Sequence, residues 1–61
     1  MDAKQVKCRR DYITVPVWPG VAPERIRVLR KQDVGGVTWF QVKFLSDGGR
    51  VCMHPTHFQP V

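Results

Sequence analysis

Four side chains of this sequence are of the types that bind zinc or act as nucleophiles. Cys52, His54 and His57 follow one another in the order Cys-x-His-x-x-His, and Cys8 lies far upstream. Thiolate sulfur and imidazole nitrogen are the usual ligands of structural zinc. The spacing matches no zinc signature built from two closely spaced ligand couples. We therefore expect no bound metal, and we interpret these residues as a buried, reduced thiol and two surface imidazoles.

The same side chains do not form a recognisable catalytic set. A cysteine–histidine nucleophile needs a third group that orients the base, together with a pocket for the substrate, and this short chain offers neither. The glycine pairs Gly35-Gly36 and Gly48-Gly49 lie in expected hairpin turns and make no phosphate-binding loop. We expect a protein that is not an enzyme and that uses no cofactor.

Positive charge is the more informative chemical feature. Ten Lys and Arg stand against five Asp and Glu, which gives a net charge of +5. Such a surface attracts polyanions: nucleic acid, anionic lipid or an acidic protein. No apolar run approaches the ~20 residues that span a bilayer, and the first five residues lack the apolar segment of a secretory signal. We expect a cytoplasmic protein without a membrane partner.

The elements that position these charges are strands. Residues 37–45 alternate between an apolar and a mixed set of side chains, which is the pattern of a strand with one buried face. Asp47-Gly48-Gly49 then supplies a tight hairpin turn that leads into a second arm over residues 50–54. The inward set is Phe40, Val42 and Phe44, and the outward set is Trp39, Gln41 and Lys43.

Further strands are expected over residues 12–18 and 25–32, with a last short one over 59–61 beside the first. Proline opens a single 3₁₀ turn over residues 55–58, and Trp18 is expected to plug one end of the core. We divide the chain into a basic, partly flexible arm (1–10) and one all-β domain (11–61). Its predicted core is Ile13, Val15, Ile26, Val28, Phe40, Val42, Phe44 and Val51.

The order of these elements resembles the Src-homology-3 (SH3) family. The resemblance rests on the strand at 26–29, the Trp39-Phe40-Gln41-Val42 strand, the Asp47-Gly48-Gly49 turn and the Pro-x-x-aromatic turn at 55–58. It implies a five-stranded SH3-like barrel with one 3₁₀ turn near the C-terminus. By position, Trp39, Pro55 and Phe58 resemble the platform on which that family holds proline-rich peptides.

A fainter resemblance is to the small plasmid-borne dihydrofolate reductases, which assemble the same barrel into a tetramer. The segment Val51-Cys52-Met53-His54-Pro55 is similar to their pore-lining Val-Gln-Ile-Tyr-Pro. Cys52 and His54 replace the Gln and Tyr that contact cofactor and substrate there. The resemblance therefore implies, at most, an oligomeric pore enzyme as a remote alternative.

Three functional hypotheses follow. The first is a non-catalytic module that binds nucleic acid through cations grouped around an outward tryptophan, and we favour DNA over RNA as its ligand. The second is an adaptor that binds an acidic or apolar segment of a protein partner with Trp39, Pro55 and Phe58. The third is the oligomeric enzyme. The residues predicted to bind nucleic acid are Arg9, Arg10, Arg25, Arg27, Lys31, Trp39, Gln41, Lys43 and Arg50.

Overall fold

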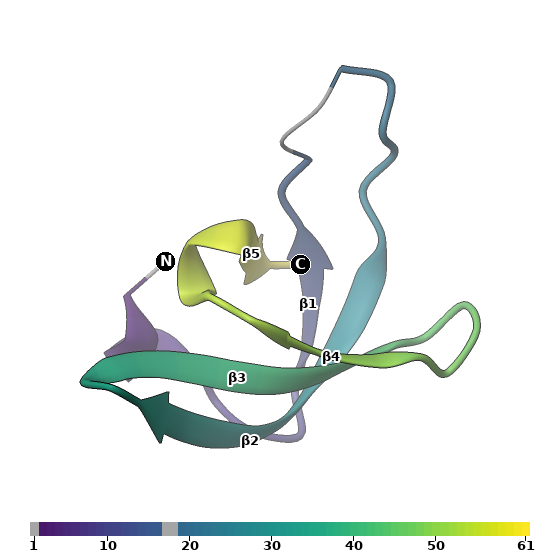
Figure 1. Cartoon of the computed structure of the whole chain (residues 1–61). Coiled ribbons are helices and arrows are strands. Elements are labelled where there is room, and N and C mark those ends of the chain that lie inside the picture. Colours follow the sequence, from purple (N-terminus) through teal and green to yellow (C-terminus); the bar gives the residue numbers. More distant parts are fainter. Residues whose placement is uncertain (1, 17–18) are drawn as a thin grey trace.

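A computed structural model describes residues 2–16 and 19–61 of the chain, so the predicted plug Trp18 lies outside the described residues. All five strands belong to one antiparallel sheet, which confirms the all-β class (Figure 1). The strands are β1 (Asp11–Thr14), β2 (Arg25–Val34), β3 (Val37–Phe44), β4 (Arg50–Met53) and β5 (Phe58–Pro60). Two 3₁₀ turns accompany them, η1 (Ala3–Gln5) and η2 (Pro55–His57).

The sheet has the order β4-β3-β2-β1-β5, so the last strand pairs with the first, as predicted. Within the described ranges no pairing joins β4 to β5, and the sheet is open between these two edge strands. Figure 1 shows β2 and β3 as one long curved hairpin, with β5 and η2 above it in this view. This arrangement is compatible with a small SH3-like barrel.

Two glycine turns set the lengths of the strands. Gly35 and Gly36 both have positive φ (57° and 80°), which is the requirement of a two-residue type I′ turn. The β2–β3 hairpin therefore runs to Val34, beyond the predicted end at residue 32. In the second turn the Gly48 N–H donates to the Phe44 carbonyl at 2.8 Å, which confirms the turn predicted there.

The core lies on the concave side of the sheet. Ile26, Val28, Phe40 and Val42 are buried as predicted, and Phe44 is half-buried against them. Sequence reasoning missed two further members, Tyr12 and Phe58. The ring of Phe58 packs edge-on against Tyr12 and Phe40, with centroid distances of 5.2 and 6.0 Å.

The prediction for β1 was wrong in its parity. Tyr12 lies opposite the buried Ile26, whereas Ile13 lies opposite the exposed Arg25. The hydroxyl of Tyr12 accepts a hydrogen bond from the Lys7 N–H at 2.8 Å, so this ring is buried without an unpaired polar atom. Ile13, which we expected in the core, is only half-buried.

Two other predicted core residues are exposed. Val15 lies beyond the end of β1 and is 39% exposed. Val51 lies opposite the buried Val42 but is 41% exposed, because β4 is an edge strand with no strand beyond it.

The N-terminal arm contributes a 3₁₀ turn that the sequence did not predict. Asp2 accepts from the Lys4 N–H at 3.0 Å and so caps η1. The arm then contacts β2, since the Arg9 N–H donates to the Val28 carbonyl at 2.7 Å and the Val28 N–H donates to the Arg10 carbonyl at 3.1 Å. The flexibility of the arm stays a prediction.

No helix among the described residues has the length and apolar character needed to cross a membrane.

Candidate nucleic-acid interface

Three cations form a row across the convex side of the sheet. Arg27 on β2 lies directly opposite Lys43 on β3, and Lys43 lies directly opposite Arg50 on β4. Residues that are paired in this way share one face of a sheet. Neighbouring strands lie about 4.8 Å apart, so the row spans about 10 Å at its Cα atoms. We call Arg27, Lys43 and Arg50 the cation row.

One acid ends the row. Asp11 on β1 lies opposite Arg27, and the Arg27 Nε–H donates to an Asp11 carboxylate oxygen at 2.9 Å. This hydrogen bond lowers the pKa of Asp11 and raises that of Arg27. Both side chains stay in contact with solvent.

The other acids do little to neutralise the cations. Arg27–Asp11 is the only ion pair within residues 2–16 and 19–61. Asp2, Asp33 and Asp47 accept hydrogen bonds from uncharged local donors, a backbone N–H or a threonine hydroxyl. Lys43 and Arg50 therefore lie opposite each other on β3 and β4, and neither forms an ion pair with a carboxylate.

A β-bulge at Leu29 decides which side chains join the row. Val28 pairs with Val42 but Arg30 pairs with Gln41, so β2 carries one extra residue here. The bulge reverses the alternation of β2 beyond it. Arg30 is brought to the convex side, where sequence reasoning did not place it, and Lys31 lies opposite the buried Phe40. The prediction that Lys31 shares the face of Trp39 was wrong.

The convex side of β2, β3 and β4 changes character along its length. At the Gly35-Gly36 turn it carries the exposed pair Val34 and Val37. The next pair along the strands is Gln32 and Trp39. It is followed by Arg30 and Gln41, and then by the cation row. We define the outer face as Arg27, Arg30, Gln32, Trp39, Gln41, Lys43 and Arg50.

Most of the residues predicted to bind nucleic acid come together on this face. Trp39, Gln41 and the cation row belong to it, and Arg25 lies on the same side, two residues before Arg27 on β2. Arg9 and Arg10 are exposed and hydrogen-bonded through their backbone to Val28, beside β2. Arg30 lies on the outer face although it was not predicted to bind nucleic acid, whereas Lys31 was predicted and lies on the opposite face.

Trp39 is half-buried at the border of the outer face. Its indole packs edge-on against the His54 ring at a centroid distance of 5.5 Å and an interplanar angle of 80°. His54 is fixed in turn as the cap of η2, where its Nδ1 accepts from the Thr56 N–H at 3.3 Å. His57, on the same turn, has its ring centroid 6.4 Å from that of His54.

The predicted peptide platform is wrong in two of its three members. Phe58 is only 1% exposed and belongs to the core, and Pro55 is buried at the start of η2. Only Trp39 remains accessible to a partner. The sequence pattern Pro-x-x-Phe gave the turn correctly but not the side on which its apolar residues lie.

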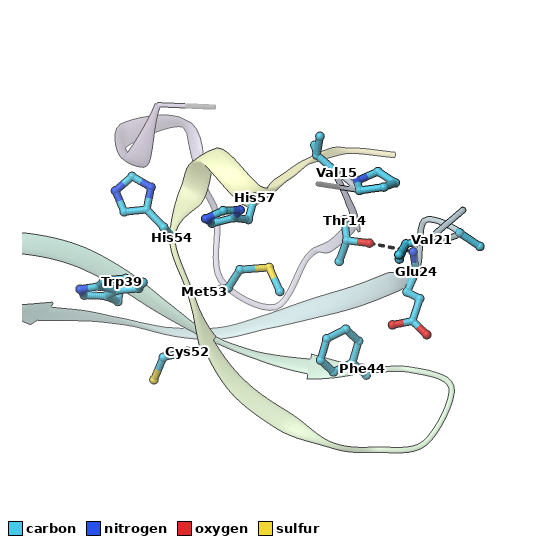
Figure 2. Close-up of a pocket in the computed structure, with 12 residues that line it drawn as sticks. Thr14, Val15, Val21, Glu24, Trp39, Phe44, Cys52, Met53, His54 and His57 are labelled. Atoms are coloured by element: carbon cyan, nitrogen blue, oxygen red, sulfur yellow. Dashed lines mark hydrogen bonds between the residues drawn. The ribbon is translucent and has the colours of Figure 1, made fainter. Parts of the chain in front are cut away.

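An open pocket of about 390 Å³ lies next to Trp39, between η2, the edge strand β4 and the loop after β1 (Figure 2). Figure 2 shows Met53 and His57 near its middle, with Trp39 at one end and Glu24 at the other. Its lining is mostly apolar and comprises Thr14, Val15, Pro16, Val21, Ala22, Glu24, Trp39, Phe44, Cys52, Met53, His54 and His57.

The zinc-type residues do not converge. Across the part of the chain that the structure describes, no three His, Cys, Asp or Glu side chains are arranged to hold a metal ion. Cys8 and Cys52 are free and exposed, so the prediction of a buried thiol was wrong. The Cys52 thiol donates weakly to Gln32 of the outer face, with a sulfur–oxygen distance of 3.8 Å.

Comparisons of the chain with protein-family models, with curated proteins and with solved structures found no match.

Proposed function

We propose that this chain is a non-catalytic module of the SH3-like type that binds nucleic acid, DNA in the first place, through the outer face. The observation that carries the proposal is the cation row. Like charges directly opposite one another destabilise a sheet, and Lys43 and Arg50 are held in that arrangement while neither forms an ion pair with an acid. A polyanion that supplies phosphates removes this repulsion.

The dimensions of the row suit a phosphate backbone. Its length of about 10 Å equals the axial rise of about three nucleotides of one stacked strand, at 3.4 Å each. Three cations then meet about three phosphates. Arg30 and the glutamines beside the row add hydrogen-bond donors and acceptors, which are the groups that contact base edges.

An acidic protein segment is the competing partner, because it is attracted by the same charges. The amides and the indole that share the outer face with the row favour nucleic acid, since bases offer planar rings and polar edges that a run of carboxylates lacks. Polyglutamate of equal charge is therefore the control ligand.

The test is a titration of a labelled single strand of about 12 nucleotides and of the corresponding duplex. Three phosphate contacts give a slope of log K against log salt of about −2 for the single strand, so affinity falls about twentyfold between 50 and 200 mM salt. Polyglutamate should bind more weakly than either DNA. Absence of binding, a slope near zero, or tighter binding of polyglutamate would overturn the proposal.

A further inference from the structure

We propose that the pocket beside Trp39 receives one unstacked base of the single strand whose phosphates lie on the cation row. This inference rests on the proposed function and adds to it a preference for single strands, because a paired base in a duplex is not available to a pocket. The volume of about 390 Å³ lies within the range of pockets that take small organic ligands.

The pocket and the cation row are connected along two strands. Cys52, on the pocket wall, follows Arg50 by two residues on β4, which is a distance of about 7 Å. Trp39, also on the wall, shares the outer face of β3 with Lys43, four residues further along the strand. At 3.4 Å per nucleotide, a strand whose phosphates lie on the row therefore reaches the pocket within about two nucleotides.

The walls of the pocket suit a flat ring with polar edges. Trp39, Phe44 and Met53 supply apolar and aromatic surface. Stacking of a base on an aromatic side chain raises affinity by about 5- to 150-fold, with little dependence on sequence. The indole of Trp39 is held in place by its contact with His54, which is itself fixed as the cap of η2.

The charge of the pocket excludes phosphate and admits a base. Glu24 brings a carboxylate to the end of the pocket opposite Trp39. A phosphate in the pocket would meet this like charge, whereas the exocyclic amine of cytosine or adenine would donate a hydrogen bond to it. The phosphates therefore bind to the cation row, and one base binds in the pocket.

The experiment uses the full chain with Trp18→Phe, which leaves Trp39 as the only tryptophan. Two probes of equal length are titrated: single-stranded oligodeoxycytidine, and the same phosphodiester chain built from abasic sugars. The oligodeoxycytidine should bind at least fivefold more tightly and quench the Trp39 fluorescence. The abasic chain should bind with the same salt dependence and without quenching.

Ala22→Phe is the matched variant, because Ala22 is exposed on the pocket wall and lies in the loop between β1 and β2, outside the strands that carry the cation row. Filling the pocket should lower the affinity for oligodeoxycytidine to that for the abasic chain and leave the latter unchanged. If both probes bind with the expected salt dependence but equally and without quenching, the pocket assignment is wrong and the proposed function stands. If neither probe binds, both fail.

Discussion

The cation row makes a prediction that separates it from the net charge of the chain. We compare the double variant Lys43→Gln/Arg50→Gln with Lys4→Gln/Lys31→Gln. Each removes two positive charges, but only the first pair lies on the outer face: Lys31 faces the side of Phe40, and Lys4 lies on η1. Arg27 is left intact because its replacement would also break the ion pair with Asp11.

The magnitude follows from counterion release. Each phosphate contact with a single strand contributes about 0.7 to the salt slope. Loss of two contacts lowers the slope by about 1.4, so the change in affinity between 50 and 200 mM salt falls from about twentyfold to about threefold. The control pair should keep the twentyfold change.

The assay is fluorescence anisotropy of a labelled single strand at several salt concentrations. Circular dichroism and thermal unfolding of each variant establish that the fold is retained, and glutamine preserves much of the aliphatic stem of the side chain it replaces. If both double variants lose the same salt dependence, binding reflects bulk charge and the row has no special part in it.

Four further predictions concern the core, the acid beside the row and the pocket. Phe58→Ala should destabilise the protein by about 3–5 kcal/mol, against a total of about 3–9 kcal/mol for a domain of this size; a small shift in urea midpoint would show that Phe58 is not a core residue. Asp11→Asn should strengthen binding of a single strand by freeing Arg27, and unchanged affinity would mean that Arg27 takes no part. Because the folded-state pKa of Asp11 is lowered, its ion pair stabilises the protein above the unfolded pKa of about 3.9, and this stability is lost as pH falls through the lowered value. The difference in unfolding free energy between wild type and Asp11→Asn, measured with urea, should therefore narrow as the pH is lowered. A difference that stays constant with pH would contradict this. Glu24→Gln should reduce a preference for oligodeoxycytidine over oligothymidine, and an equal preference in both proteins would remove Glu24 from base selection.

The sequence predicted β3 and the turns around it because their signals are local. Phe40 and Val42 alternate with Trp39 and Gln41, so only one face of the strand is suited to burial. The structure buries that face, with Phe40 and Val42 inside. Gly48 accepts the positive φ that the following turn requires. The shared face of Lys43 and Arg50 followed from this hairpin alone.

The remaining features depend on contacts between distant segments. Nothing within residues 25–34 indicates that Leu29 is the extra residue, because the bulge is defined only by pairing with β3. It nevertheless exchanges Lys31 for Arg30 on the outer face. In β1, Tyr12 and Ile13 are both apolar enough for the core, and the choice is made by Phe58 and by the Lys7 N–H, which are remote in sequence or outside the strand.

The central claim is that one face of the sheet, and not the whole surface, binds nucleic acid. The most direct measurement is an NMR titration of the ¹⁵N-labelled chain with a short single strand, following every backbone amide and the Trp39 indole N–H. We predict that the largest shift changes occur at the cation row and at Trp39, while η1 and β5 change little. Changes concentrated on η1, or spread evenly over the strands, would contradict the claim.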